Sequence, residues 1–465
     1  MRSFRNHIVM FLWLQALLFS AATLSFATRI PRYSFACQLD SVSFSLSSNS
    51  LQLFYPAMTS ELAAQSALSP LWKLPSAGAT AFRSELVRVI DSLHRLQLIG
   101  EPYHVAVLKR LVQLPTVQGS ARSDTTLLAT HYFLDALLAT AFDLFRGYKV
   151  ASHVGYDKIS ISYQRRDDSI IKAGVLSIQS KEQLHRWLFS LEPLQREYVL
   201  LKKALLENQP LVAAEIRSSK GDTLYKIRHS LHLYRWLFHF KLDRFFLVNI
   251  AAAGAQYVEK GQLLIAMRAI VGKKTTPTPR FASYCRQLIL YPYWYVPSSI
   301  AIGEHLSKIK RDPRWLDQRN MQVIDAKGFV VDHHRLNWRQ FNAAYFPYTI
   351  RQSTGCDNAL GVLKFDIETP YGVYLHDTNH KAAFLQSSRF LSHGCIRLDE
   401  PLLLGNELLN GGLDTTYLQS CFADKKPIFR SLPEPLAVFC LYLPAEVDKQ
   451  GRILLYRDVY GWLKK

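Results

Sequence analysis

The sequence predicts an α+β protein in which a mostly helical N-terminal domain precedes a β-rich domain. From about residue 28 to residue 243, apolar residues recur three and four positions apart, as they do along helices that face a core. From residue 244 to residue 465, short apolar or alternating runs are separated by turns, which is typical of strands. The length of 465 residues is enough for two or three domains.

The N-terminus has the features of an export signal. Arg2 and Arg5 precede an apolar run over residues 8–22, and Ser25 and Ala27 are the small residues that a signal peptidase requires. Because this run is short for a membrane span, we expect cleavage after Ala27 rather than an uncleaved anchor. Residues 1–27 are thus predicted to be a signal peptide, and the mature protein is expected outside the cytoplasm, peripheral to a membrane at most.

The composition is ordinary but the charge is not. Hydrophobic residues make up 49% and charged residues 20% of the chain, whereas the formal net charge is +19. This excess favours anionic partners such as an acidic wall polymer or anionic lipid. Export argues against nucleic acid, and because the basic residues are scattered, part of the excess is a solvated surface.

The helical domain, residues 28–243, is predicted from four segments. Residues 85–93 and 127–145 have helical spacing, and Ser123-Asp124 is a plausible cap for the second. Two further stripes are separated by Pro193 and are interpreted as core packing. They comprise Leu184, Trp187, Leu188 and Leu191, and then Leu194, Tyr198, Leu201 and Leu205.

The β-rich domain, residues 244–465, begins with two apolar runs, 245–250 and 262–271. Residues 258–261 form a turn between them, so the pair is predicted to be a hairpin. Further strands are expected at 286–291, 362–367, 372–377, 436–443 and 452–456.

Residues 300–352 break the strand pattern. A helix-like stretch begins at His305 and ends at Pro313, and aromatic residues such as Trp315, Trp338 and Phe341 crowd the remainder. We interpret this segment as an insertion, and it is either a lid over a site or a small hydrophobic cluster that only packs.

Six cysteines occur without zinc-binding spacing: Cys37, Cys285, Cys356, Cys395, Cys421 and Cys440. An exported protein can carry a disulfide, and Cys421 with Cys440 is the nearest candidate pair. His333-His334 has no acidic or cysteine ligand at metal spacing, so we interpret it as a solvated loop and expect no metal site.

The candidate chemistry lies in residues 374–397. Cys395 follows Ser392, His393 and Gly394, and a thiol needs a base to become a nucleophile. Gly394 lets the backbone N–H groups face a developing oxyanion.

The candidate base is His376. Strand alternation places it on one face with Tyr374, and the carbonyl of Asp377 or Thr378, or a side chain there, could fix its tautomer. Arg397 can bind a substrate carboxylate or hold the loop.

These residues resemble the L,D-transpeptidase (YkuD-type) signature, a histidine followed by Ser/Thr-His-Gly-Cys. Flanking segments such as 247–250, 270–279, 294–297 and 358–361 resemble the larger YcbB-like group of Gram-negative bacteria. The resemblance covers residues 244–465 well and the helical domain loosely.

The resemblance implies a periplasmic enzyme of peptidoglycan biosynthesis, cell-wall organisation and cell shape. Cys395 would form a thioester with a donor stem peptide, and the amine of a second stem would resolve it into a 3-3 cross-link. His376 would be the base, and Ser392, His393 and Gly394 would shape the loop and oxyanion site. It further implies that no cofactor is needed. The expected partners are peptidoglycan stem peptides and other cell-wall synthesis proteins, and a capping lid is expected at about 300–352.

By the same resemblance, Arg397, Tyr374 and Trp294 would contact the substrate, with Trp294 at the root of the lid. The chain also departs from this group. Only about forty residues separate Leu205 from Phe245, too few for the peptidoglycan-binding module of that group. Asn379-His380 follow Asp377-Thr378 where a proline is common, and His380 is a second-choice base.

Several alternatives stay open. The thioester could pass to water, in an L,D-carboxypeptidase or hydrolase, or to a lipoprotein. A different class is a non-catalytic wall-binding scaffold that uses its basic surface. A papain-type protease places its cysteine before its histidine, whereas here His376 precedes Cys395.

Overall fold

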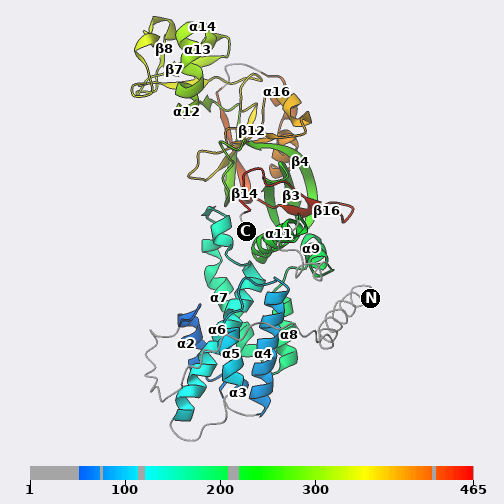
Figure 1. Cartoon of the computed structure of the whole chain (residues 1–465). Coiled ribbons are helices and arrows are strands. Elements are labelled where there is room, and N and C mark those ends of the chain that lie inside the picture. The colour runs from blue at the N-terminus through cyan, green and yellow to red at the C-terminus, as the bar shows by residue number, and fades with distance from the viewer. Residues whose placement is uncertain (1–51, 74–76, 114–120, 208–218, 422–425, 464–465) are drawn as a thin grey trace. The chain divides into compact units, whose positions relative to one another are not determined.

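A computed structural model describes residues 52–73, 77–113, 121–207, 219–421 and 426–463 (Figure 1). Contacts divide the chain into Met1–Gln52 and a compact unit, Leu53–Lys465. The predicted signal peptide and Cys37 lie outside the described residues. Within the second unit, helices come first and strands follow, so the α+β class predicted from the sequence is confirmed.

Helices dominate the chain as far as residue 239. They are α2 (Pro56–Ala64), α3 (Pro70–Lys73), α4 (Ala77–Arg95), α5 (Val105–Gln113), α6 (Ala121–Arg146), η2 (Val150–His153), η3 (Ser160–Ser162), α7 (Gln164–Ser177), α8 (Lys181–Ser190), α9 (Arg196–Glu207) and α11 (Ser219–His239).

Two details of the helical prediction are wrong. Helix α6 begins at Ala121, so Ser123-Asp124 lies in its first turn and does not precede it. Leu194 lies before α9 and its side chain is 70% exposed, so it does not belong to the buried stripe of that helix. Helix α8 ends at Ser190, and Pro193 and Leu194 both lie in the connection between α8 and α9.

Helix α6 is the long central helix of this part. The stretch Thr126–His153, which contains most of α6, is long and apolar enough to cross a membrane by length and composition. Seventy-eight per cent of its most apolar window is buried inside the protein, which is the environment of a core helix.

The strands of the second part, with the short β1, form one main sheet. They are β1 (Tyr156–Asp157), β2 (Arg244–Asn249), β3 (Gly254–Glu259), β4 (Gln262–Gly272), β5 (Phe281–Leu290), β10 (Leu363–Ile367), β11 (Leu375–His376), β12 (Phe390–Ser392), β13 (Ile396–Leu398) and β14 (Ile428–Leu441). Helices α15 (Pro401–Leu408) and α16 (Thr415–Gln419) lie between β13 and β14, and β15 (Ala445–Val447) pairs with β16 (Ile453–Leu455).

The order of the main sheet is β1-β5-β10-β11-β13-β4-β3-β2-β14, with β12 beside β4. Strand β14 pairs with β2 on one side and with β5 on the other. The path from β5 through β10 to β14 therefore closes on itself, and the short strands β11 and β13 lie between β10 and β4 in that path.

The predicted hairpin is only partly right. Residues 258–261 do turn the chain, but the turn joins β4 to β3, and β3 lies between β2 and β4. Strand β3 starts at Gly254 after three alanines, residue types that are depleted in strands, which is why the sequence pattern missed it.

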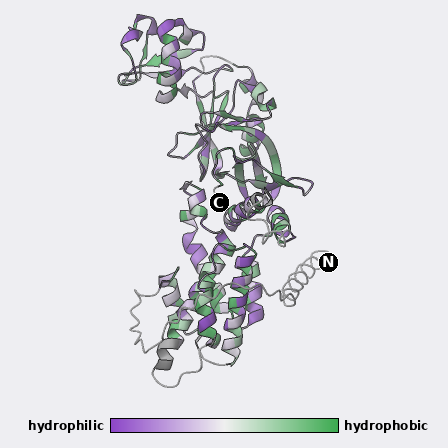
Figure 2. Ribbon diagram, in the orientation of Figure 1, coloured by the Kyte–Doolittle hydropathy of each residue, from purple (hydrophilic) through white to green (hydrophobic). Residues whose placement is uncertain are grey.

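The helices and the sheet share apolar contacts. Trp236 of α11 and Phe240, the residue after that helix, pack against Phe439 of β14 with ring centroids 5.5 and 5.9 Å apart. Figure 2 shows hydrophobic residues along the strands and mixed faces on the helices. The predicted boundary at 243/244 coincides with the change from α11 to β2, and it stays a prediction as a domain boundary.

The expected insertion has its own core and its own sheet, of order β6-β9-β7-β8. It contains β6 (Trp294–Tyr295), α12 (Ser298–Ile300), η4 (Ala301–His305), α13 (Leu306–Arg311), α14 (Arg314–Asp317), β7 (Met321–Ile324), β8 (Val330–Val331), η5 (His333–Arg335), η6 (Trp338–Gln340) and β9 (Thr349–Gln352). The expectation that it lacks strands is therefore wrong, because these strands are too short for alternation to be recognised.

Asn358 fastens both ends of this insertion. Its buried side-chain amide donates to the carbonyl of Pro292, before the insertion, and to that of Ser353, after it, at 3.1 and 2.7 Å. Its Oδ1 accepts from the backbone N–H of Leu360 at 2.7 Å.

The disulfide differs from the candidate pair. Cys356 is bonded to Cys421, whereas Cys440 is a free, buried thiol within β14. Cys440 points into the core of the closed sheet, so it cannot reach Cys421 at the surface after α16. The bond ties the segment that follows the insertion to α16.

Candidate active site

Strand register gathers five polar side chains on one face of the sheet. His376 of β11 lies opposite Lys364 of β10 and opposite Arg397 of β13. Tyr374 precedes His376 by two residues, and Cys395 precedes Arg397 by two, so alternation directs both toward the same face. The backbone N–H of Ile396 donates to the carbonyl of Tyr374 at 2.8 Å and holds the two segments together.

This register makes His376 a diagonal neighbour of Cys395 on the adjacent parallel strand. The sequence predicts both residues for the site, and the structure brings them to one face.

The tautomer of His376 is fixed by the backbone. Its Nδ1 bonds the carbonyl oxygen of Asp377, its own neighbour in the chain. Because a carbonyl only accepts, Nδ1 carries the proton and Nε2 keeps its lone pair, which is the form that can take a proton from a thiol. The sequence suggested this carbonyl as one of several options.

The carboxylate of Asp377 is bound by a backbone N–H and by a lysine. It accepts from the backbone N–H of Val362 at 3.0 Å and from Lys381 Nζ at 2.6 Å. A Cβ on Gly361 would lie 2.2 Å from this carboxylate, and Gly361 has φ +60°, so only glycine fits there. Asp377 therefore anchors the turn before β10.

Electrostatics favour a neutral pair at rest. Burial lowers the pKa of His376 to about 3, and the Arg397 cation adds to that shift. Burial also raises the pKa of the Cys395 thiol, although Arg397 and Lys364 act in the opposite direction. The resting site thus contains a thiol and a neutral imidazole, with two cations that stabilise the thiolate once it forms.

Three residues shape the loop before Cys395. Ser392 Oγ donates to the carbonyl of Cys395 at 2.6 Å and accepts from the backbone N–H of Gly394 at 3.1 Å. Gly394 has φ +116°, a conformation that L side chains rarely adopt. His393 has a different surrounding, since its Nε2 lies 2.6 Å from Glu304 of η4 in the insertion.

Thr278 also holds this loop, and motif reasoning from the sequence gave it no role. Its hydroxyl, fully buried, accepts from the backbone N–H of Gly272 at 2.8 Å and donates to the carbonyl of Gly394 at 2.8 Å. Tyr460, near the C-terminus, bonds the carbonyl of Gly272. These contacts join residues that are far apart in the chain, so only the folded structure around β4 reveals them.

Lys364 is the other residue that sequence reasoning missed. Its Nζ lies 3.8 Å from the centroid of the Tyr374 ring, and its charge lowers the pKa of Cys395. A lysine in a short strand has no motif signal, and only the register with His376 places it at the site.

Two other candidates lie elsewhere. Trp294 is half-buried in β6, where its ring contacts His305 of the insertion at 6.1 Å between centroids. This is the root of the insertion, as expected, and Trp294 packs against the core of the insertion. His380, the second-choice base, is exposed at the start of η7 (Lys381–Leu385).

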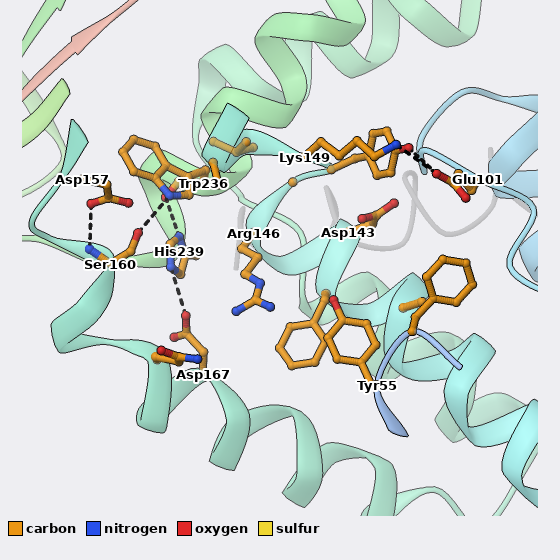
Figure 3. Close-up of a pocket in the computed structure, with 18 of the residues that line it drawn as sticks. Tyr55, Glu101, Asp143, Arg146, Lys149, Asp157, Ser160, Asp167, Trp236 and His239 are labelled. Carbon is orange, nitrogen blue, oxygen red and sulfur yellow. Dashed lines mark hydrogen bonds and ion pairs between the residues drawn. The ribbon is translucent and has the colours of Figure 1, made fainter. Parts of the chain in front are cut away.

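A cavity of about 460 Å³ lies in the helical part (Figure 3). Its walls include aromatic rings, the pair of Asp167 with His239 at 3.2 Å, and Arg146, which lies 4.2 Å from the centroid of the Phe142 ring. No described cysteine lines this cavity. It is therefore separate from the face that carries Cys395.

Comparison with known proteins gives a consistent result. Residues 243–405 match the family model of the L,D-transpeptidase catalytic domain (YkuD). A protein of Haemophilus influenzae named "Putative L,D-transpeptidase" is 32% identical over 216 residues, which cover 46% of this chain and 44% of that protein. The chain thus spans less than half the length of this curated relative.

Solved structures of L,D-transpeptidases are also similar, at low scores. The L,D-transpeptidase from Mycobacterium smegmatis is 19% identical to this chain, with a TM-score of 0.21. The match covers 42% of this chain and 58% of the Mycobacterium smegmatis chain. L,D-transpeptidase 1 of Mycobacterium tuberculosis is 13% identical, with a TM-score of 0.16, and the match covers 43% of this chain and 61% of the Mycobacterium tuberculosis chain.

Proposed function

We propose, because residues 243–405 match the family model of the L,D-transpeptidase catalytic domain, that the chain is an exported enzyme that modifies peptidoglycan through a Cys395 thioester. The observation that carries the proposal is the face shared by Cys395 and His376, with Nδ1 of His376 bonded to a carbonyl. The proposed products are 3-3 cross-links between stem peptides in the periplasm.

In the first step, the thiol proton of Cys395 passes to Nε2 of His376 as the sulfur attacks the carbonyl carbon of the third residue of a donor stem. Because the resting groups are neutral, proton transfer accompanies the attack, and Arg397 and Lys364 stabilise the negative sulfur. Backbone N–H groups of the loop at Gly394 are suited to receive the oxyanion. The C–N bond to the terminal D-alanine then breaks, and the imidazolium returns the proton to the leaving amine.

In the second step, the amine of an acceptor stem attacks the thioester. His376 takes the amine proton, the C–S bond breaks, and the departing sulfur recovers a proton from the imidazolium. Water as the acceptor would give a carboxypeptidase or hydrolase, and a lipoprotein amine would give an anchored protein. A scaffold without chemistry is disfavoured because Arg397 and Lys364 both act on the Cys395 thiol and the oriented imidazole of His376 lies on the same face.

The test is incubation of the purified protein with disaccharide-tetrapeptide, followed by mass spectrometry of the products. We expect a cross-linked dimer and free D-alanine from the parent protein, and neither from Cys395→Ala. The matched control is Cys285→Ala, which alters a buried thiol in β5. This variant should keep its activity. Cross-linking by folded Cys395→Ala would contradict the proposal, while tripeptide or a lipoprotein adduct would identify another acceptor.

A further inference from the structure

The insertion contains three potential metal ligands that converge in space. Asp317 closes α14, and His333 and His334 open η5, sixteen residues later in the chain. Nε2 of His333 lies 3.1 Å from Oδ1 of Asp317, and Nε2 of His334 lies 3.1 Å from Oδ2. The three ligand atoms all lie within 4.8 Å of one another. The sequence-based interpretation of the histidine pair as a ligand-free loop rested on the lack of an acidic partner, and Asp317 supplies one.

The backbone holds both histidines in place before any ion binds. The carbonyl of His333 accepts from the indole N–H of Trp338 at 2.8 Å, and Trp338 is buried in the core of the insertion. The backbone N–H of His334 donates to Asp332 Oδ1 at 3.0 Å. The two rings lie side by side, 4.2 Å between centroids and 37° apart in plane. Such a site has little conformational freedom to lose on binding.

Charge compensation differs between Asp317 and its acidic neighbours. Asp312 pairs with Arg314, and Asp332 pairs with Arg335. In contrast, the carboxylate of Asp317 has no lysine or arginine partner among the residues that the structure describes, and only the two imidazoles face it. A negative charge is thus left for a cation.

One of the ring nitrogens is also unsatisfied. Nε2 of His333 is buried and makes no hydrogen bond, even though it lies close to Oδ1 of Asp317. Buried polar atoms in proteins normally have a partner, so this nitrogen points to a missing one. A metal ion between the imidazole and the carboxylate would satisfy both.

We propose that Asp317, His333 and His334 form a binding site for a divalent transition metal of the zinc type, which stabilises the insertion. Two imidazole nitrogens and one carboxylate are ligands that suit Zn²⁺, whereas Mg²⁺ and Ca²⁺ prefer all-oxygen sites. With metal–ligand bonds of about 2.1 Å, tetrahedral ligands lie about 3.4 Å apart. The observed 3.1 Å separations are therefore close to the spacing of a loaded site.

The ion would connect α14 to η5, two elements that are separated in the chain by β7 and β8. It therefore serves the structure of the insertion and takes no part in the thioester chemistry. The insertion contacts the catalytic loop through Glu304 and His393, so a firmer insertion would hold that contact more steadily.

The test is calorimetric titration of the full chain with Zn²⁺ after removal of metal by a chelator. The protein should carry Cys395→Ala throughout, because a reactive thiol is itself a zinc ligand. We expect one equivalent to bind and the melting temperature to rise with zinc concentration. Asp317→Asn and, separately, His334→Ala should weaken binding by more than about tenfold, since loss of even an outer partner costs that much.

The matched control is Asp312→Asn, which removes an exposed carboxylate of the same segment that pairs with Arg314. It should bind zinc within about threefold of its parent. Circular dichroism would establish that each variant is folded; His334 is half-exposed, so its truncation leaves the core intact. Equal zinc affinity in all variants, or no saturable binding at all, would overturn the proposal and leave the cluster as a histidine–carboxylate ion pair.

Discussion

Replacing Thr278 by valine should slow acyl transfer without unfolding the protein. Valine keeps the shape of threonine but removes the hydroxyl that links Gly272 to Gly394 through two 2.8 Å hydrogen bonds. Both backbone groups would then be buried without that partner, and each such loss costs about 1–3 kcal/mol. The loop can relieve part of the cost by moving, which displaces the N–H groups beside Cys395.

If about 2 kcal/mol of this cost falls on the transition state, kcat/KM decreases about 30-fold, because 1.4 kcal/mol is a factor of ten. The assay is the initial rate of D-alanine release from disaccharide-tetrapeptide, with the melting temperature measured in parallel. Thr278→Ser keeps the hydroxyl and should recover most of the rate. A Thr278→Val rate within threefold of the parent, or a serine variant as slow as the valine one, would refute this role of the hydroxyl.

Three further predictions concern the site and its supports. The rate of Cys395 alkylation by iodoacetamide should keep rising with pH above about 8.5, because burial raises the pKa of the thiol; a plateau below pH 6 would indicate a thiolate–imidazolium pair with His376 instead. Reduction of the Cys356–Cys421 bond, which closes a loop of 65 residues, should lower the free energy of unfolding by about 4 kcal/mol in chemical denaturation, and an unchanged midpoint after verified reduction would contradict this. Asn358→Ala removes three hydrogen bonds, so it should destabilise the protein by about 2–4 kcal/mol and increase proteolysis of the insertion; equal cleavage of variant and parent would count against its fastening role.

Acid should also destabilise the fold, and the sign follows from His376. Its pKa is about 3 in the folded protein and about 6.5 when unfolded, so the unfolded chain binds more protons between these values. Stability is therefore present above about pH 6.5 and is lost as the pH falls toward 3. Denaturant midpoints measured across this range should decrease as the pH is lowered from about 6.5 toward 3.

Much of the catalytic face could be predicted from local sequence. Cys395, Gly394 and His376 lie in a specific motif, and the match of residues 243–405 to the L,D-transpeptidase catalytic domain confirms the resemblance drawn from it. The likeness to the larger YcbB-like group stays a prediction, as do the signal peptide and the periplasmic location.

The contacts that could not be predicted from the sequence join residues that are far apart in the chain. Lys364 reaches His376 only through the register of β10 with β11, and Thr278 reaches Gly394 across 116 positions of the chain. The disulfide was mispredicted for the same reason, since proximity in sequence says little about which cysteines meet in space. Asp317 lies too far from His333 in the chain for ligand spacing to be recognised.

The central claim is that an imidazole makes one particular thiol acylable, and trapping the acyl-enzyme tests it most directly. The protein would be mixed with donor tetrapeptide or with a penem, quenched in acid, digested and examined by mass spectrometry. We predict one acyl group on the peptide that contains Cys395, none on the peptides of Cys356, and slow or absent labelling in His376→Gln. Donor turnover with Cys395 unmodified, or equal labelling rates in His376→Gln and the parent, would contradict the account.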